Sequence, residues 1–339
     1  MNRLDIKTAD IEKELERLGQ PAFRAKQIRR WIFERGASSF ARMTDLPASL
    51  RDALAARFVI RTARIAGHVE SSDGTRRFAL RLDDDNVIES VLVAMRKGWT
   101  ACLSSQVGCR RRCTFCASGA RGLVRNLSAG EILDEALLMR AESPASLRNV
   151  VFMGIGEPLD NYDHVLAAVR TIIAEDGLRI GARRVTISTC GIVPAIERLA
   201  GEGLQVKLAV SLNAPDDARR SQLMPVNRRW PLGRLLGACR RYAEATGRRV
   251  TFEYVLMRNV NDAPADARGL AALLRGLACK VNVLRLNPHE HQPSHTVSRR
   301  AAYLFRAALE DAGIEATVRG SKGADADAAC GQLRLRALE

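Results

Sequence analysis

The feature that most constrains this fold is the alternation of short apolar segments with amphipathic segments after residue 100. Apolar runs typical of buried strands are expected at 101–107, 150–153, 184–189, 206–211, 251–256 and 281–286, with a further strand at 315–318. Helical periodicity separates them at 128–141, 163–174, 193–199, 231–245, 265–274 and 298–312. Strands that alternate with helices form parallel sheets, and these units predict an α/β fold, a partial (β/α)6 barrel. Ligands bind such sheets at the carboxyl ends of the strands, so functional side chains are expected there.

Two segments precede the alternating region. Residues 1–58 show helical periodicity interrupted at Gly19 and Gly36, which predicts an N-terminal helical domain. The basic residues Lys26, Arg29 and Arg30 form one helix face, which is either solvated or in contact with RNA. Residues 59–98 contain strand-like runs separated by an Asp-Gly pair, and they predict a small antiparallel β connector. Residues 99–339 form the barrel domain in this division.

The chain is strongly basic. Its 53 Lys and Arg against 38 Asp and Glu give a formal net charge of +15. This balance favours a polyanionic partner such as nucleic acid, although an Arg-rich proteome would produce it too. Paired arginines such as Arg219 and Arg220 are candidates for phosphate contact or for a solvated surface. No apolar run is long enough to cross a bilayer and none follows the basic N-terminus, so we expect a cytoplasmic protein without membrane contact.

The sharpest chemical signal is the segment Cys-Arg-Arg-Arg-Cys-Thr-Phe-Cys at 109–116. Clustered thiols in a cytoplasmic chain indicate a metal or redox site before a disulfide scaffold. Cys109, Cys113 and Cys116 follow the first predicted barrel strand, and each could bind one iron of a four-iron cubane, leaving one iron open. Structural zinc is the alternative, but no fourth Cys or His follows at a usual spacing. A zinc-stabilised RNA-binding protein without catalysis is therefore a remote alternative.

This loop resembles the radical S-adenosylmethionine (SAM) motif, in which the open iron of a [4Fe-4S] cluster binds the amino and carboxylate groups of SAM. Further segments, which together span nearly the whole chain, are similar to the RlmN/Cfr family of rRNA adenine methyltransferases. They are Phe-Arg at 23–24, Met-Thr-Asp at 43–45, Ser-Ser-Asp-Gly-Thr at 71–75, Ser-Ser-Gln-Val-Gly-Cys at 104–109 and Ala-Ala-Cys-Gly-Gln-Leu at 328–333. The resemblance implies a partial radical-SAM barrel, with an N-terminal helical domain and a small β connector that help to grip RNA.

The resemblance also places cofactor contacts at the ends of predicted strands. Gly156 and Glu157 match the family segment that holds SAM, where glycine lets backbone amides approach the ligand and Glu accepts from its ammonium group. The other implied contacts are Ser188, Ser211, Leu212, Asn213 and Asn287. Family members commonly carry His where this chain has Asn213, so we expect a retuned contact there. Without the resemblance, a single Ser or Asn at a strand end is more often a helix cap.

Two lone cysteines and one carboxylate complete the implied site. By composition alone, Cys102 and Cys330 are typical of small buried side chains and Glu89 of a surface carboxylate. Adenine C2 and C8 are too electron-poor to attack a sulfonium methyl, so methylation there requires radical addition. The resemblance implies that the Cys330 thiolate takes a methyl group from one SAM, and that a second SAM supplies the 5′-deoxyadenosyl radical that activates it. Addition to adenine follows, Glu89 removes the ring proton, and Cys102 attacks the Cys330 sulfur to release the base as a disulfide forms.

The substrate has alternatives within the family. RlmN-like members methylate C2 of an adenosine in the peptidyl-transferase region of 23S rRNA, some also a tRNA anticodon-loop adenosine, and Cfr-like members methylate C8. Segments 104–108 and 252–255 look RlmN-like, whereas 97–99 and Gly119 with 122–123 look Cfr-like, and we favour C2. Aromatic residues make up only 5% of the chain, so extrusion of one base into a pocket fits better than an extended stacking surface. The family implies a flavodoxin-type reductant, and a monomer is the default expectation.

Overall fold

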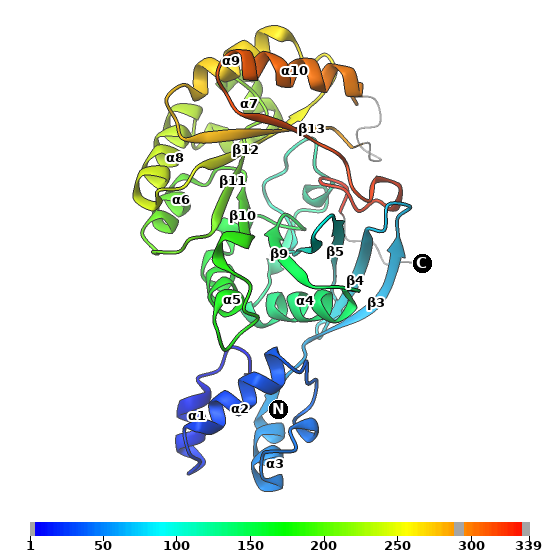
Figure 1. Cartoon of the computed structure of the whole chain (residues 1–339), viewed down its shortest axis with the longest axis vertical. Coiled ribbons are helices and arrows are strands. Elements are labelled where there is room, and N and C mark those ends of the chain that lie inside the picture. Colours follow the sequence, from blue (N-terminus) through cyan, green and yellow to red (C-terminus); the bar gives the residue numbers. More distant parts are fainter. Residues whose placement is uncertain (1–3, 288–294, 334–339) are drawn as a thin grey trace.

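The computed structural model describes residues 4–287 and 295–333. A small helical part, blue in Figure 1, lies against one end of a larger α/β body. It contains β1 (Leu4–Asp5), α1 (Ile11–Arg17), α2 (Phe23–Phe33), α3 (Ala48–Arg57) and β2 (Phe58–Val59), and β1 pairs with β2 in parallel. The buried Lys7 ammonium joins this part to the body, because it lies 2.9 Å from Asp5 and 3.1 Å from Asp134.

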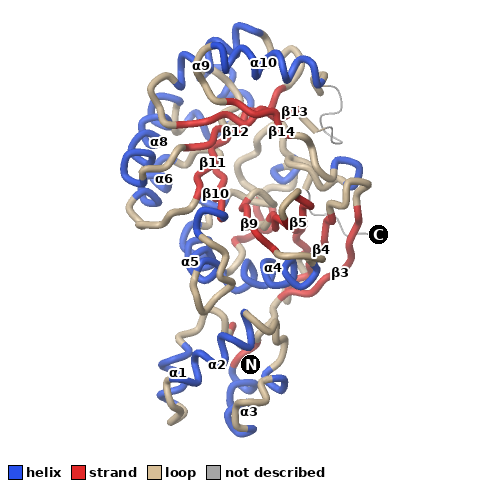
Figure 2. The backbone as a smooth tube through the Cα atoms, in the orientation of Figure 1, coloured by secondary structure: helices blue, strands red, loops and turns tan. Residues whose placement is uncertain are grey.

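A ten-stranded sheet organises the body, in the order β14-β13-β12-β11-β10-β9-β6-β5-β4-β3. Its parallel strands are β6 (Gly98–Cys102), β9 (Leu147–Phe152), β10 (Val185–Thr189), β11 (Lys207–Ser211), β12 (Val250–Leu256), β13 (Cys279–Arg285) and β14 (Ala316–Arg319). The helices that connect and cover them are α4 (Ala129–Glu142), α5 (Tyr162–Ile173), α6 (Val193–Ala200), α7 (Asp217–Leu223), α8 (Leu232–Thr246), α9 (Pro264–Leu274) and α10 (Arg299–Asp311). Figure 2 shows these helices outside the curved sheet. The predicted partial βα barrel is confirmed.

Side-chain alternation along the strands separates a helix-facing core from the barrel interior. On β12 the side chains of Val250, Phe252 and Tyr254 are fully buried, whereas Thr251 and Glu253 between them are only partly buried. Successive strand residues point to opposite faces, so the apolar set packs under the helices and the alternate set faces inward. The less buried inner face indicates that the barrel encloses space.

The strands of the predicted connector exist, but they extend the barrel sheet. β3 (Ala63–Glu70), β4 (Arg76–Leu82) and β5 (Val87–Met95) form an antiparallel meander. β5 then pairs with β6 from Val91 opposite Cys102 to Met95 opposite Gly98. The N-terminal helical segment, the connector and the barrel remain a predicted division into domains.

The first barrel strand is shorter than the sequence predicted. The run expected at 101–107 divides into β6, which ends at Cys102, and β7 (Gln106–Gly108), which pairs with β8 (Leu123–Asn126) in a separate two-stranded sheet. The chain leaves the barrel sheet between these strands, and the cysteine-rich loop lies between β7 and β8. In the described part of the chain, no helix combines the length and apolarity that a membrane crossing requires.

Candidate active site

The cysteine-rich loop is held in place by backbone hydrogen bonds at several points. The Cys109 amide donates to the Gly122 carbonyl at 2.9 Å, and the Thr114 amide donates to the Leu223 carbonyl at 3.0 Å. Arg112 has a φ of 52°, a left-handed conformation that turns the loop. These contacts bring the three sulfurs predicted to bind iron to the wall of one cavity, which is lined by Cys109, Cys113 and Cys116.

The three thiols of the loop are the residues that could hold an iron–sulfur cluster. Burial raises the pKa of Cys109 to about 12, and burial together with the charges of Cys116 and Cys109 raises the pKa of Cys113. Thiols in this state bind a metal only with loss of their protons, which a strongly charged group must compensate. Over residues 4–287 and 295–333, no three His, Cys, Asp or Glu side chains are arranged to hold one metal ion. A cubane binds each thiolate through a different iron, so three cysteines without a fourth Cys or His at a usual spacing are the ligands that the predicted [4Fe-4S] cluster would need.

The cavity beside the three cysteines has a volume of about 170 Å³, and strand ends form its opposite wall. Gly156, Glu157, Ser188, Ser211 and Asn287, all predicted cofactor contacts, line it. A Cβ atom on Gly156 would lie 2.7 Å from the Gln106 Cβ, and its φ is +109°, so this close approach requires glycine.

Glu157 is buried and already holds two loops together. Its Oε1 accepts from the Leu159 amide at 3.0 Å, and its Oε2 accepts from the Cys190 amide at 2.7 Å. Burial raises the pKa of Glu157, and the two amides oppose that effect. Glu157 also lines the cavity, so its carboxylate can contact a bound ammonium group while it fixes the strand ends.

Two predicted cofactor contacts do not reach the cavity. Leu212 and Asn213 are fully buried and line neither of the two cavities described here. The Asn213 Oδ1 accepts from the Val255 amide at 2.8 Å, and its backbone has a φ of 61°. Asn tolerates this left-handed conformation, so the structure gives Asn213 a role in shaping the loop after β11. The cofactor contacts of Leu212 and Asn213 therefore stay predictions.

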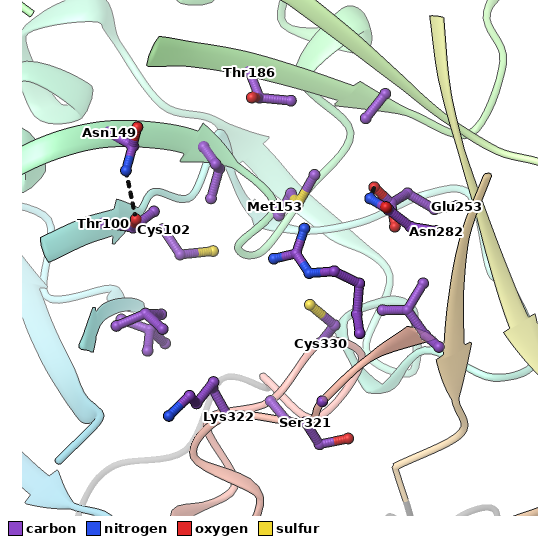
Figure 3. Close-up of a pocket in the computed structure, with 18 of the residues that line it drawn as sticks. Thr100, Cys102, Asn149, Met153, Thr186, Glu253, Asn282, Ser321, Lys322 and Cys330 are labelled. Carbon is purple, nitrogen blue, oxygen red and sulfur yellow. Dashed lines mark hydrogen bonds between the residues drawn. The ribbon is translucent and has the colours of Figure 1, made fainter. Parts of the chain in front are cut away.

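A second cavity, of about 460 Å³, holds the two lone cysteines. Cys102 and Cys330 both line it, and Figure 3 shows both side chains pointing into the same space. Cys330 also lines the small cavity beside the cluster loop. Burial raises the pKa of both thiols. Cys330 has a large exposed fraction nonetheless, because the space that it faces is the cavity interior.

The loop that carries Cys330 is fixed at both sides of that residue. The Asp325 carboxylate accepts from the Ser71 hydroxyl and from the Ser72 amide, the latter at 3.0 Å, so it attaches the loop to the β3–β4 turn. Beyond Cys330, the Gly331 carbonyl accepts from the Ala117 amide at 2.9 Å, which joins the loop to the cluster segment. The Cys330 carbonyl itself accepts from Asn287 Nδ2 at 3.0 Å. The segment 71–75, which the sequence analysis noted without a role, is therefore an anchor of the Cys330 loop.

Glu89, the predicted base, lies behind the wall of the large cavity. Its carboxylate is fully buried and accepts from Arg77, with 2.5 Å between Nη1 and Oε1. Strand alternation puts it on the same face of β5 as Val91 and Val93, which do line the cavity. The alternative of a surface carboxylate, which composition alone favoured, is thus wrong, while the role of Glu89 as a base stays a prediction.

Two other carboxyl groups near the cavities were not predicted from the sequence. Glu253 lines both cavities, and its Oε1 accepts from Asn282 Nδ2 at 2.8 Å, while burial raises its pKa. Glu135 accepts from the Ser90 hydroxyl and from the Ser104 amide, and burial raises its pKa to about 8. A charged residue within the apolar strand β12 could have indicated a functional role for Glu253. The sequence around Glu135 contains no such signal.

Arg220 is another correction, because the sequence suggested either phosphate contact or a solvated surface for it. Its side chain is fully buried, and its guanidinium donates to the carbonyls of Leu212, Ser211 and Cys190 and to the side chain of Asn227. It joins the loops after β10 and β11 beneath the cluster segment. The eight cysteines are all free in this structure, so the disulfide implied between Cys102 and Cys330 stays a prediction.

Comparisons with known proteins agree with this geometry. Residues 103–270 match the radical SAM superfamily, and residues 1–60 match the family described as the ribosomal RNA large subunit methyltransferase N-terminal domain. A probable dual-specificity RNA methyltransferase RlmN of Symbiobacterium thermophilum is 50% identical over 94% of this chain and 87% of its own length. A dual-specificity RNA methyltransferase RlmN of Syntrophus aciditrophicus is 44% identical over 100% of this chain and 99% of its own.

A solved structure shows the same fold. The crystal structure of a radical SAM methyltransferase from Sphaerobacter thermophilus covers 98% of this chain and 100% of its own, with a TM-score of 0.95 and 46% identity. The fold and the cysteine loop define a radical SAM enzyme. Within that class, the chain belongs to the RlmN family of methyltransferases.

Proposed function

We propose that this chain methylates C2 of an adenine base in RNA, with 23S rRNA and tRNA as its substrates. The relatives are called dual-specificity RNA methyltransferases, and the N-terminal match is to a methyltransferase of ribosomal RNA, which supports an RNA substrate. One observation carries the proposal: the Cys330 side chain lines both cavities, and Cys102 lines the larger one. A single sulfur can then meet a methyl donor on one side and an acceptor base on the other.

Methyl transfer in this proposal uses the cluster cysteines, Cys330 and Glu89. When bound, a [4Fe-4S] cluster on Cys109, Cys113 and Cys116 and two SAM molecules per turnover supply the methyl group and a carbon-centred radical. The Cys330 thiolate would accept the methyl group, and one hydrogen of that methyl would pass to the carbon-centred radical. The resulting methylene carbon would bond to the adenine ring, which attaches the RNA to the protein. Glu89 accepts the ring proton in this proposal, because it lies on the same face of β5 as Val91 and Val93, which line the large cavity.

Release of the product requires the second cysteine. The Cys102 thiolate attacks the Cys330 sulfur, the bond between that sulfur and the methylene carbon breaks, and a disulfide remains. The released carbon takes up a proton to become the product methyl group, and the surplus electron left by radical addition would return to the cluster. The two thiols line the same cavity, which supports this assignment. A flavodoxin-type reductant supplies electrons to the cluster, and the chain works as a cytoplasmic monomer in this proposal.

A trapping experiment tests the proposal. Cys102→Ala should accumulate RNA covalently bound to protein, visible as a shifted band of radiolabelled 23S rRNA fragment on a denaturing gel, and Cys330→Ala should form no such band. Cys239→Ala is the matched control, because Cys239 is fully buried on α8 and lines neither cavity. Free turnover by Cys102→Ala would remove Cys102 from the mechanism.

Two further measurements address the alternatives. Mass spectrometry of digested product RNA distinguishes a methyl group on C2 from one on C8, and a C8 product would contradict the proposal. Anaerobically purified protein should be brown and contain iron. A colourless preparation that contains zinc would instead support a protein without radical chemistry.

A further inference from the structure

The large cavity extends toward the amino-terminal ends of the barrel strands. On β11, Lys207 and Ala209 line the large cavity, whereas Ser211, nearer the carboxyl end, lines the small one. On β10, Thr186 lines the large cavity and Ser188 the small one. Met153, Glu253, Leu284, Asn287 and Cys330 line both. The two cavities are therefore arranged one after the other along the strands, with Cys330 at their junction.

Basic side chains surround the amino-terminal end of the large cavity. Arg184 directly precedes β10, Lys207 begins β11, and Lys280 is the second residue of β13. We refer to these three residues as the basic mouth. Arg184 also lines a neighbouring surface hollow together with other arginines, among them Arg148 and Arg179. Positive charge thus continues from the cavity onto the outer surface at this end.

The cations of the basic mouth form no close ion pair among the described residues, although Lys280 interacts electrostatically with the carboxylates of Glu253 and Glu315. Many arginines of this chain form ion pairs, but within residues 4–287 and 295–333 none of Arg184, Lys207 and Lys280 does. Burial and the charges of Lys280, Arg248 and Arg184 lower the pKa of Lys207, which shows that the cations repel one another. Glu253 is the only acidic side chain among the described residues that line this cavity. An anion bound here would relieve the repulsion.

The spacing along the strands suits a nucleotide. Glu253 lies at the junction with Cys330, and Thr251, two residues earlier on β12, pairs with Lys280 of the basic mouth. Two residues of strand span about 7 Å, which is similar to the separation between a purine ring and its own phosphate. A base in contact with Cys330 can therefore place its backbone phosphates at the basic mouth. Aromatic side chains are absent from the described lining of the large cavity, so charge and shape would hold the nucleotide.

We propose that RNA enters the barrel at the amino-terminal ends of the strands, with its phosphates bound by Arg184, Lys207 and Lys280. The inference rests on the proposed function, because it takes Cys330 as the methyl carrier. Parallel sheets usually take their ligands at the carboxyl ends of the strands. Here the cluster loop and the small cavity already lie at that end, so the cofactor and the RNA would enter from opposite ends.

Binding measurements on the cluster-reconstituted full chain test the route. The variants are Arg184→Ala, Lys207→Ala, Lys280→Ala and the triple variant, and the probe is a transcribed 23S rRNA hairpin titrated across a KCl series. Removal of one phosphate-binding cation should weaken binding about five- to eightfold at 0.1 M salt and lower the slope of log K against log salt by about 0.7 to 0.9. The triple variant should show roughly the product of these effects.

Matched controls separate this site from general positive charge. Arg234 on α8 and Arg268 on α9 are exposed arginines outside both cavities, so Arg234→Ala and Arg268→Ala should bind like the parent. Cluster absorbance of each variant shows whether the barrel has folded. In the parent protein, bound RNA should also protect Lys207 and Lys280 from acetylation, read by mass spectrometry, which needs no variant at all.

The outcomes distinguish the two proposals. If the parent methylates RNA while the basic-mouth variants bind like it and RNA leaves both lysines unprotected, the entry route is wrong and the methyltransferase stands. If the basic-mouth variants lose binding and the lysines are protected, but no methylated adenine or covalent adduct ever forms, the entry route stands and the proposed chemistry is wrong. Equal losses in the control variants would also overturn the route.

Discussion

Arg220 gives the prediction that can be worked furthest from the structure. Its buried guanidinium donates to the carbonyls of Leu212 at 3.1 Å, Ser211 at 2.9 Å and Cys190 at 2.8 Å, and to the Asn227 side chain at 2.8 Å. Methionine at this position would keep much of the volume and remove every donor. Each buried acceptor left without a partner costs about 1 to 3 kcal/mol, so the gross loss is roughly 4 kcal/mol at the low end.

Removal of the buried charge offsets part of this loss of stability. A buried guanidinium is itself costly, and burial lowers the pKa of Arg220, which shows that the charged form is penalised here. We therefore expect Arg220→Met to reduce the free energy of unfolding by about 2 to 4 kcal/mol. Arg220→Lys keeps the charge but cannot reproduce the fork of donors, and we expect a loss of about 2 kcal/mol.

Urea unfolding of the iron-free protein, followed by circular dichroism under reducing conditions, measures these changes. Arg234→Met is the control, because Arg234 is an exposed residue on α8 and its replacement should change stability by less than about 0.5 kcal/mol. If Arg220→Met also stayed within that margin, the guanidinium would not be holding the strand-end loops together, and the reasoning would fail.

Three further predictions concern single side chains. Because burial raises the pKa of Glu135 from 4.5 to about 8, its contribution to stability is present below pH 4.5 and is lost as the pH rises to about 8. Urea midpoints at pH 5, 6.5 and 8 should therefore fall more steeply in the parent than in Glu135→Gln, and parallel curves would contradict this. Asp325→Asn should weaken the anchor of the Cys330 loop and speed alkylation of Cys330 by iodoacetamide, read by mass spectrometry, whereas an unchanged rate would show that the anchor does not restrain the thiol. Gly156→Ala should weaken SAM binding more than tenfold by calorimetry, while Gly201→Ala, whose added Cβ would come no closer than 3.5 Å to its neighbours, should leave it unchanged.

The alternating part of the fold could be predicted because its signal is local. Apolar strands and amphipathic helices follow one another regularly, and β12, β13 and their helices appear close to the expected bounds. The predicted length of the first barrel strand was wrong because strand pairing, a tertiary contact, ends it early. The apolar run continues past Cys102, but pairing with β9 stops there and the next strand pairs with β8 instead. Periodicity cannot show where a strand changes its partner.

The site could be predicted only in part. The spacing of Cys109, Cys113 and Cys116 is a local signal, and the structure brings the three to one cavity. Burial of Arg220 depends on carbonyls from loops distant in sequence, so the pair of arginines looked like surface charge. The left-handed backbone of Asn213 could not be predicted either, because it depends on the conformation of the loop after β11.

The basic mouth was not predicted from the sequence, because we expected ligands only at the carboxyl ends of the parallel strands. Lys207 and Lys280 stand at strand starts, where sequence reasoning does not seek function. Their significance depends on a cavity that extends along the barrel interior.

The pairing of β5 with β6 has a consequence for how the protein can be divided. A fragment that starts at residue 99 would leave β6 without its neighbour and turn it into a bare sheet edge, which invites other chains to add a strand. Cys102 would lie at that edge, opposite an absent Val91. A shortened barrel would therefore tend to aggregate and to misplace one of its two thiols, so expression trials should keep residues 63–95 attached.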